Sequence, residues 1–307
     1  MKSYDITFLG HMCYDEIIPF HGPKRIAPGS AVLCGAVAAA RAGAKVAVVT
    51  KLAEKDRHIL KALEDEAIDV MVIPAEETTY SRVIYVSENH DVRRLVLEKS
   101  AGLITIEQVP EIKSRYLHLA AISNQEFDLS LMRALKSRGH MLSVDMQSFV
   151  RQVDPATREI AFKDVAEKHE IFGLVDRVKL DMVEVQALTG LNDLEEAAPV
   201  LESWGAKEMV ITQNTGVWAW AGGRGWSEKF SNKSDIGRTG RGDTTFAAYL
   251  AYRLEHAIPT SLKFAAALVS IKMETPGPFQ GTLAEVLARM HRLQMNGAKG
   301  DLHGPFS

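Results

Sequence analysis

The chain has 307 residues, of which 46% are hydrophobic and 24% charged, a profile typical of a globular protein with a substantial core. Its net charge of -3 argues against a nucleic-acid-coating surface, because such domains are usually strongly basic. Two cysteines, Cys13 and Cys34, form no disulfide framework and favour a reducing compartment. The N-terminus lacks the apolar core of a signal peptide, and no apolar run is as long as a membrane span. We therefore expect a cytoplasmic protein that binds neither nucleic acid nor a membrane.

The first part of the chain alternates short apolar strands with helices. A small, helical pattern runs from Ala31 to Ala42, with Gly43 as its C-cap, and a second helix is predicted near 54–66. The residues at 21–30 are turn-rich. Strands are predicted at 6–9, 16–20, 45–50 and 70–74. This alternation predicts a parallel sheet covered by helices on both faces.

The stretch from Tyr80 to Glu98 breaks this alternation. Two β-type runs, at 81–87 and 92–98, flank the polar residues 88–91, which predicts a hairpin. The hairpin is too polar for the centre of the main sheet. Together with the extended piece before it, it would form a small sheet that projects from the main one. We expect this lid to comprise approximately residues 11–28 and 78–99.

The alternation then resumes to the end of the chain. Short apolar strands are predicted at 116–120, 141–145, 175–180 and 208–212, a glycine-turned hairpin at 218–226, and three helices at 244–254, 261–273 and 283–293. The glycine-rich tail, 296–307, is predicted to be loose. The expected fold is a three-layer α/β/α domain spanning 1–307, with a mainly parallel central sheet and a small β lid.

The segment SDIGRTGRGDTTF places three glycines, Gly237, Gly240 and Gly242, directly before an apolar helix. Glycines allow several backbone N–H groups to point at one spot, and the positive end of the following helix dipole favours an anion there. Asp243 lies at the rim of this site. A carboxylate beside an anion site is useful if it deprotonates an alcohol that attacks a bound phosphate. A plain loop-to-helix junction, with Asp243 as a first-turn acid, would show the same pattern.

The same segment resembles the second signature of the ribokinase-like (PfkB) carbohydrate kinases, DTxGAGDxF, on which Gly240, Gly242, Asp243 and Phe246 fall. The resemblance implies that Asp243 is the catalytic base. It also implies an anion hole made by the backbone of Gly240, Arg241 and Gly242. The implied fold is the ribokinase-like fold.

Two positions depart from the signature. Gly237 stands where the family has an aspartate, and Arg241 stands where it has a small residue. Arg241 could place a cation beside the transferring phosphate, which would stabilise the transition state. It could equally face solvent or pair with Asp235.

Two further segments resemble the metal and nucleotide sites of the family. In VKLDMVEVQALTG, Asp181 and Glu184 occupy the polar positions of an N-x-x-E element, which implies Mg²⁺ held through water, although an exposed helix face would look the same. Thr212 and Gly216 would lie near ATP, and Ala267 would line the adenine slot unless it serves helix packing. The implied cofactors are ATP and Mg²⁺.

The acceptor side of the family pattern is partly kept. Cys34 replaces a substrate-binding asparagine, and a thiol cannot supply the paired donor and acceptor of an amide. Ribose or adenosine bound in the usual way is therefore not expected. Arg151 could contact substrate or form a surface ion pair. The resemblance implies six substrate-binding residues: Asp15, Gly29, Ser30, Cys34, Asp145 and Arg151.

Together the motifs resemble a divergent branch of the family that includes inositol and keto-gluconate kinases. The sequence thus predicts ATP-dependent phosphorylation of a hydroxyl on a small sugar, polyol or sugar acid. A nucleoside, ribose or fructose kinase of the same family is an alternative, as is a kinase-fold binding protein without catalysis. No P-loop motif or zinc-ligand spacing occurs, and the glycine cluster lies too late for a dinucleotide-binding fingerprint. The open edge of the lid needs cover, and a homodimer is one way to supply it.

Overall fold

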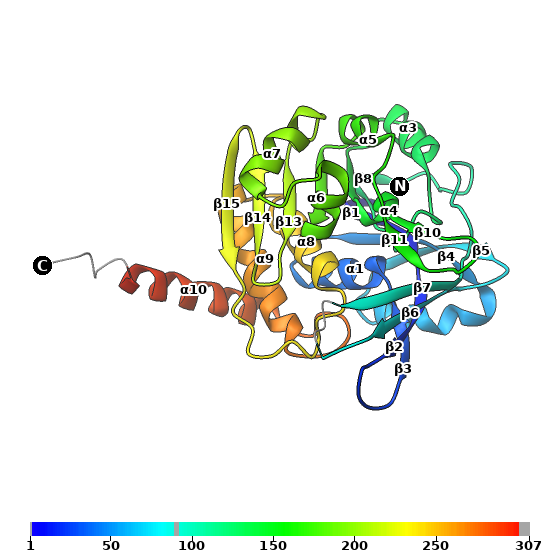
Figure 1. Cartoon of the computed structure of the whole chain (residues 1–307), viewed down its shortest axis with the longest axis horizontal. Helices are drawn as coiled ribbons and strands as arrows, with labels where there is room; N and C mark the ends of the chain where they lie inside the picture. Colours follow the sequence, from blue (N-terminus) through cyan, green and yellow to red (C-terminus); the bar gives the residue numbers. More distant parts are fainter. Residues whose placement is uncertain (1, 89–91, 301–307) are drawn as a thin grey trace, which may run out of the picture.

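A nine-stranded sheet forms the centre of the molecule, with strand order β15-β14-β13-β12-β9-β8-β1-β4-β5 (Figure 1). The computed structural model describes residues 2–88 and 92–300. Strands β13, β12, β9, β8, β1, β4 and β5 run parallel, and the hairpin β14-β15 continues the sheet antiparallel at one edge. The strands span Ser3–His11 (β1), Val46–Ala53 (β4), Asp69–Ala75 (β5), Lys113–Leu119 (β8), Leu142–Asp145 (β9), Arg177–Asp181 (β12), Met209–Thr212 (β13), Gly216–Ala221 (β14) and Arg224–Lys229 (β15).

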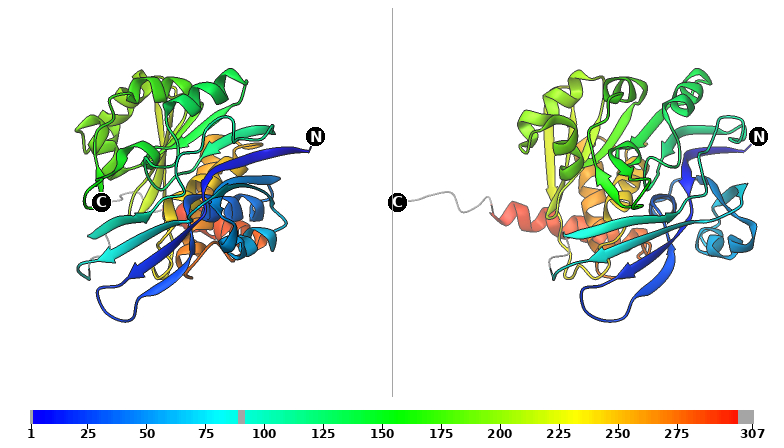
Figure 2. Two further views of the ribbon diagram at one scale, coloured as in Figure 1. Left: turned by 90° about the vertical axis from the view of Figure 1, so that its right-hand side faces the viewer. Right: turned by 45° about the vertical axis from the view of Figure 1, so that its right-hand side comes forward.

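Helices cover both faces of this sheet (Figure 2). Side chains alternate between the faces of a strand, so Phe8 of β1 packs under one helix layer and Leu9 under the other. One layer contains α1 (Ala31–Arg41), α2 (Lys61–Glu64), α8 (Arg241–Tyr252), α9 (Ile258–Met273) and α10 (Leu283–Gly300); the other contains α3 (Leu129–Ser137), α5 (Lys168–Leu174), α6 (Met182–Thr189) and α7 (Leu194–Ser203). The three-layer α/β/α architecture predicted from the sequence is confirmed.

A second, four-stranded sheet projects from the main body (Figures 1 and 2). This small sheet has the order β3-β2-β6-β7, in which β2 and β6 are parallel and the outer pairs are antiparallel. Its strands span Arg25–Gly29 (β3), Cys13–Ile18 (β2), Thr79–Tyr85 (β6) and Arg93–Lys99 (β7). The predicted hairpin and its pairing with the extended piece near the N-terminus are confirmed.

A short ribbon joins the small sheet to the main body. It consists of β10 (Arg151–Val153) and β11 (Ile160–Phe162), which follow the single-turn helix α4 (Gln147–Val150). The backbone N–H of Leu97 in β7 donates to the carbonyl of Arg158 at 2.9 Å. The ribbon therefore fixes one edge of the small sheet over the main sheet.

Several local predictions differ from the structure in type or bounds. The turn-rich stretch contains the edge strand β3, and the helix predicted near 54–66 is a 3₁₀ helix, Glu54–Leu60, followed by the short α2. The loose tail was predicted to begin at residue 296, but α10 continues through Gly300, and residues 301–307 lie outside the described residues. Among the described residues no helix is both long and apolar enough to span a bilayer.

Candidate active site

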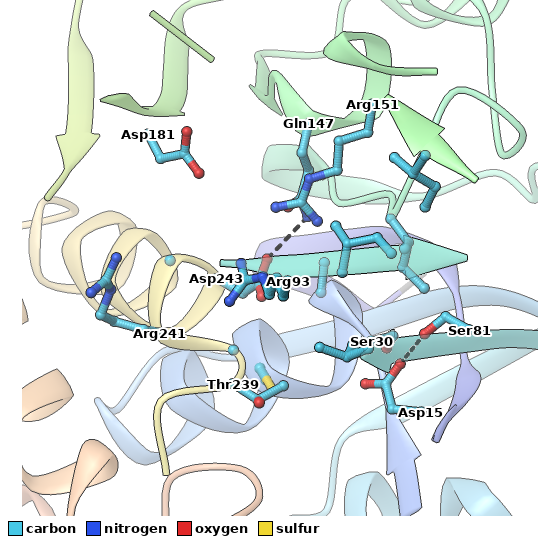
Figure 3. Close-up of a pocket in the computed structure, with 18 of the residues that line it drawn as sticks. Asp15, Ser30, Ser81, Arg93, Gln147, Arg151, Asp181, Thr239, Arg241 and Asp243 are labelled. Atoms are coloured by element: carbon cyan, nitrogen blue, oxygen red, sulfur yellow. Dashed lines mark hydrogen bonds between the residues drawn. The ribbon is translucent and has the colours of Figure 1, made fainter. Parts of the chain in front are cut away.

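A cavity lies where the carboxyl ends of the parallel strands face the small sheet (Figure 3). Crevices at this end of a parallel sheet are the usual ligand sites of open α/β folds. The main sheet contributes Lys179 and Asp181 of β12 and Thr212 of β13, and the small sheet contributes a roof through Val83 and Leu95. The turn before α8 and the start of α1 form its floor.

The glycine turn begins α8 as the sequence predicted. Gly240 is the N-cap with a φ of 78°, a left-handed conformation that favours glycine. Its hydrogens face α1, because a Cβ built there would lie 2.4 Å from the Cys34 sulfur. The N–H of Arg241 donates to the carbonyl of Arg238, so Gly242 and Asp243 are the first-turn N–H groups left without an intrahelical acceptor.

Asp243 lies in the first turn of α8 and lines the cavity. The side-chain amide of Gln147 donates to its Oδ1 at 3.3 Å and to the carbonyl of Ala121 at 2.7 Å (Figure 3). The backbone N–H of Gln147 in turn donates to Asp145 Oδ1 at 3.0 Å. A buried amide thus orients the predicted base, and the predicted substrate residue Asp145 supports that amide from behind.

A buried lysine lies directly beneath the predicted anion hole. Lys179 Nζ is 3.1 Å from Asp145 and 3.7 Å from Glu184. Burial opposes its charge, but Asp145 and Glu184 together raise the pKa of Lys179 above its ordinary value. A Cβ added to Gly242 would lie 3.2 Å from this ammonium. The glycine therefore lets a fixed positive charge approach the predicted anion hole.

The predicted metal residues stand together at the end of β12. Asp181 caps α6 and lines the cavity, and the Glu184 carboxylate accepts the Asp181 N–H at 2.8 Å in a capping box. Burial, and next the charge of Asp181, raise the pKa of Glu184 to about 8. Its buried Oε1 has no hydrogen-bond partner among the described residues and lies 3.9 Å from the Arg151 guanidinium.

These residues fit Mg²⁺ held by few protein ligands. Among the described residues no three His, Cys, Asp or Glu side chains are grouped to hold a metal ion. Mg²⁺ commonly keeps several waters and binds one or two carboxylates plus substrate phosphates. Asp181 offers such a carboxylate in the cavity, with the unpartnered oxygen of Glu184 behind it.

The opposite end of the cavity is formed by Asp15 of β2. Asp15 accepts a hydrogen bond from the Ser81 hydroxyl and a weaker one from the Cys13 thiol at 3.4 Å (Figure 3). Burial raises the pKa of Asp15. Gly29 allows this placement, because a Cβ there would lie 2.0 Å from the Asp15 carboxylate. Ser30 caps α1 through its hydroxyl but has a φ of 139°, which is strained for a non-glycine residue.

A second buried lysine holds the glycine turn in place. Lys272 of α9 donates to the carbonyls of Gly237 and Thr239, and burial lowers the pKa of Lys272. Gly237 packs so closely on α9 that a Cβ would collide with the carbonyl of Thr275. Close packing thus explains why the aspartate of the common signature is absent at this position.

The predicted nucleotide residues are not brought together. Thr212 lines the cavity, whereas Gly216 pairs with Lys229 in the β14-β15 hairpin and Ala267 is fully buried in the core. Two arginines line the cavity beside the β13-β14 turn. Arg238 donates to the Asn214 side chain at 2.8 Å, and the Arg241 guanidinium lies 3.5 Å from the same oxygen.

Most of the predicted residues do meet in one cavity. The predicted lining residues present are Asp15, Ser30, Cys34, Arg151, Asp181, Thr212, Gly240, Arg241, Gly242 and Asp243. Gly29, Asp145 and Glu184 lie directly behind them. Sequence reasoning did not assign roles to Lys179, Lys272 or Arg93. A lysine inside an otherwise apolar strand or helix was the available signal for the first two.

Comparison with known proteins agrees with this geometry. Residues 21–283 match the model of the pfkB family carbohydrate kinases. The chain is 30% identical over 214 residues to the cytidine kinase of Thermococcus kodakarensis, an alignment that spans 68% of this chain and 73% of that protein.

Two solved structures define the likeness of fold. One is a pyrophosphate-dependent kinase in the ribokinase family, complexed with a pyrophosphate analogue and myo-inositol; it has a TM-score of 0.85 at 31% identity and covers 92% of this chain and 99% of its own. The other is the Arabidopsis thaliana ribokinase complexed with ribose and ATP, with a TM-score of 0.73 at 17% identity, covering 94% and 99%. The fold is ribokinase-like, as the sequence predicted.

Proposed function

Because the chain belongs to the pfkB family of carbohydrate kinases, we propose that it transfers a phosphoryl group from inorganic pyrophosphate to a hydroxyl of an inositol-like polyol, with Asp243 as the general base. At the coarser level the chain is a sugar or polyol kinase, a phosphotransferase with a hydroxyl acceptor. The observation that carries the proposal is the position of Asp243, which shares one cavity with the Gly242 turn and is oriented by Gln147.

In the proposed mechanism Asp243 accepts the proton of the attacking hydroxyl. Gln147 holds the carboxylate in place through the 3.3 Å hydrogen bond to Oδ1. The N–H groups of Gly242 and Asp243, at the positive end of α8, bind the phosphoryl oxygens. The Lys179 ammonium behind Gly242 adds a positive charge that is fixed before the reaction begins.

Several features support pyrophosphate over ATP as the donor. The donor end of the cavity carries Arg238 and Arg241, which are tied to Asn214 in the β13-β14 turn. These contacts lie between the anion hole and the hairpin in which Gly216 sits. The predicted adenine contacts, Gly216 and Ala267, do not line the cavity. Extra guanidinium groups suit a small, highly charged donor without a nucleoside.

Mg²⁺ is the metal we expect, held near Asp181 with Glu184 behind it. When bound it would supply charge neutralisation between donor oxygens. Protein groups perform the other roles: the α8 N-terminus and Lys179 hold the anion, and Asp243 moves the proton.

The acceptor end suits a polyhydroxylated ring. Asp15 and Ser81 offer hydrogen-bonding groups at one side, and Val83 and Leu95 of the small sheet offer apolar contact for the face of a ring. Cys34 lies beneath the turn in a buried position. We propose that the small sheet acts as a lid, which excludes water so that the donor is not hydrolysed.

A matrix of donors and acceptors tests this proposal. Pyrophosphate, ATP and CTP would each be combined with myo-inositol, keto-gluconates, fructose, ribose and cytidine, with phosphorylated product measured directly by mass spectrometry. We expect the highest kcat/KM for pyrophosphate with a cyclic polyol. The identity to a cytidine kinase makes cytidine the second candidate acceptor. Turnover with ATP but not pyrophosphate would overturn the donor assignment.

A further inference from the structure

The ammonium of Lys272 is enclosed by main-chain carbonyls. Lys272 lies in the last turn of α9, and its side chain is fully buried. Among the described residues it forms no ion pair within 4 Å, and its hydrogen bonds go to the carbonyls of Gly237 and Thr239. Lysines are almost never fully buried unless their charge is paired. Here the two carbonyls of one turn take the place of a carboxylate.

Lys179, the other buried lysine of the site, shows the contrast. Its Nζ is 3.1 Å from Asp145 and 3.7 Å from Glu184, so carboxylates compensate its charge. An ammonium paired with carboxylates needs no further ligand. The surroundings of Lys272 are of a different kind, because carbonyl oxygens carry only partial charges and are the groups that bind a single monovalent cation.

Charges farther from Lys272 act on it in both directions. Burial is the main cause that lowers the pKa of Lys272, and the neighbouring Cys34 and the Asp243 carboxylate oppose this shift. Two cations, Arg25 and Arg241, act in the same direction as burial. The carboxylate of the proposed base is therefore the acidic group that acts on this lysine through space, and it belongs to the phosphate-binding turn.

The carbonyls around the ammonium come from both the turn and its support. The N–H of Gly237 donates to the carbonyl of Met273 at 2.9 Å, which fixes the start of the turn on the end of α9. The last carbonyls of a helix carry the negative end of its dipole and favour a cation nearby. Carbonyl oxygens that meet at one point repel one another unless a positive charge lies between them. Lys272 supplies that charge.

The same turn carries the groups proposed to bind the phosphoryl oxygens. Gly240 follows Thr239 directly, and a Cβ on Gly240 would lie 3.8 Å from Lys272 Nζ. In a planar trans peptide the carbonyl and the N–H point in opposite directions. Because the carbonyl of Thr239 points at the lysine, the N–H of Gly240 points away from it. The ammonium thus sets the peptide orientation just before the N–H groups of Gly242 and Asp243.

We propose that the Lys272 ammonium is a tethered monovalent cation, which holds the glycine turn in its phosphate-binding conformation so that no free ion is needed there; this rests on the kinase function proposed above. Lys272 is a positioning residue, because it is not one of the described residues that line the cavity. Potassium and ammonium ions are close in size, and carbonyl oxygens bind both. Removal of the lysine ammonium should therefore leave a place that either ion can fill.

The first test measures this vacancy without turnover. Lys272→Met retains a long apolar side chain but has no atom at the position of the ammonium. Thermal unfolding would be followed in potassium, ammonium or tetramethylammonium chloride at equal ionic strength. We expect potassium and ammonium to raise the Tm of Lys272→Met by about 2 to 4 °C over tetramethylammonium, because a ligand that binds only the folded state stabilises it. Wild type should show no such difference.

Lys263→Met is the matched control, because Lys263 is a partly exposed lysine on the same helix. Its Tm should be the same in all three salts. A response of the control equal to that of Lys272→Met would show that the salts act on the whole protein, and it would overturn the inference.

Steady-state kinetics distinguish a cation role from a purely structural one. In tetramethylammonium we expect kcat/KM for the phosphate donor to fall about 10- to 100-fold in Lys272→Met, the value of hydrogen bonds made by a charged group. The KM for the acceptor should change little. Potassium or ammonium should recover part of the lost activity. Wild type and Lys263→Met should be equally active in all three salts.

Three results would overturn the inference. One is a wild-type protein that potassium activates strongly, a measurement that stands even if Lys272→Met does not fold. Another is unaltered donor kinetics in Lys272→Met. The third is a loss of activity in Lys272→Met that no cation restores, because the side chain would then serve only to pack the turn.

Failure of the proposed function has a different signature. If the wild-type protein forms no product with any donor and acceptor, the kinase function fails for every variant alike. The thermal comparison of Lys272→Met with Lys263→Met would still decide whether the lysine occupies a cation site. If wild type and Lys263→Met are active and Lys272→Met is equally active, the function stands and the role of Lys272 falls.

Discussion

At the scale of single residues, the proposed anion hole depends on which groups the glycines allow to come close. Gly242 has no need of a left-handed backbone, yet a Cβ there would lie 3.1 Å from Lys179 Cε and 3.2 Å from its Nζ. Gly240 requires both a positive φ and space for the Cys34 sulfur. Gly242 is therefore needed so that the Lys179 ammonium can lie close, and Gly240 is needed for the backbone conformation of the turn.

Gly242→Ala tests the role of Lys179. The added methyl group must push the ammonium away from the anion hole, so we expect the KM for the phosphate donor to rise by about 10-fold, the value of roughly one charged hydrogen bond. Thermal unfolding should shift little, because the displaced group is the end of a flexible side chain. Gly173→Ala is the control, since the nearest atom that the structure describes would lie 3.9 Å from a Cβ there. Equal donor KM values in both variants would contradict the role of Lys179.

The sequence was informative for residues that carry a motif and uninformative for residues that act through space. Asp243 and the glycines stand together in the chain, so their shared site was predictable. Lys179 and Gln147 reach that site from other elements, and although a lysine within an apolar strand was a signal, no local pattern specifies which atoms either residue contacts. Arg93 was predicted only as part of a polar hairpin. The sequence alone does not show which face of that hairpin is turned toward the cavity.

At the scale of elements, strongly apolar strands were predicted well and short edge strands were not. Strand β3 carries Pro28 at the edge of the small sheet, where a missing N–H is tolerated, and its turn-rich sequence hides it. The ribbon β10-β11 has three residues per strand and contacts β7 through the bridge between Val96 and Glu159. Such elements are stabilised by neighbours and have little signal of their own.

A buried carboxyl group at the junction of β1 and β8 gives the fold a pH dependence. Glu126 accepts the backbone N–H groups of His11 and Ile122, and burial raises the pKa of Glu126 to about 8. Burial also lowers the pKa of His11 to about 3, so the facing imidazole stays neutral. The folded protein therefore retains the Glu126 proton in a pH range where the unfolded chain has lost it.

The direction of this pH dependence follows from the difference in bound protons between the folded and unfolded states. Stability from this group is fully present below the unfolded pKa of Glu126 and is lost as the pH rises through about 8. We expect the free energy of unfolding to fall between pH 6 and 8, by at most about 1.4 kcal/mol per pH unit from this group. Denaturant titrations of wild type and Glu126→Gln would measure it. The variant should show the smaller slope with pH, and parallel slopes would refute the assignment.

At the scale of the whole molecule, the small sheet offers a surface for a second copy of the chain. Among the described strands, β3 forms an open edge of the small sheet. The apolar side chains of Phe20 and Ile26 are 48% and 54% exposed, which leaves apolar surface that a second copy could cover. We propose a homodimer formed through the two small sheets. Light scattering should give twice the chain mass, and Ile26→Glu should reduce it. A wild-type monomer at micromolar concentration would exclude the dimer.

The donor is the part of the whole-molecule account that the sequence decides least. Family resemblance implied ATP, and the positions expected to meet adenine were chosen by spacing along the chain. In the fold, Ala267 is enclosed by the core, and Arg238 and Arg241 contact Asn214 in the turn just before Gly216. Those contacts depend on how two loops pack, which no single motif encodes.

The measurement that tests the central claim most directly is the turnover of Asp243→Asn with the best donor and acceptor. We predict that kcat falls by about 10²- to 10⁴-fold, the range for loss of a general base, because an amide cannot accept the hydroxyl proton. Donor binding measured by calorimetry should be close to that of wild type, since the Gly242 N–H and Lys179 remain in place. A variant that retains near-normal turnover would contradict the assignment of Asp243 as the base.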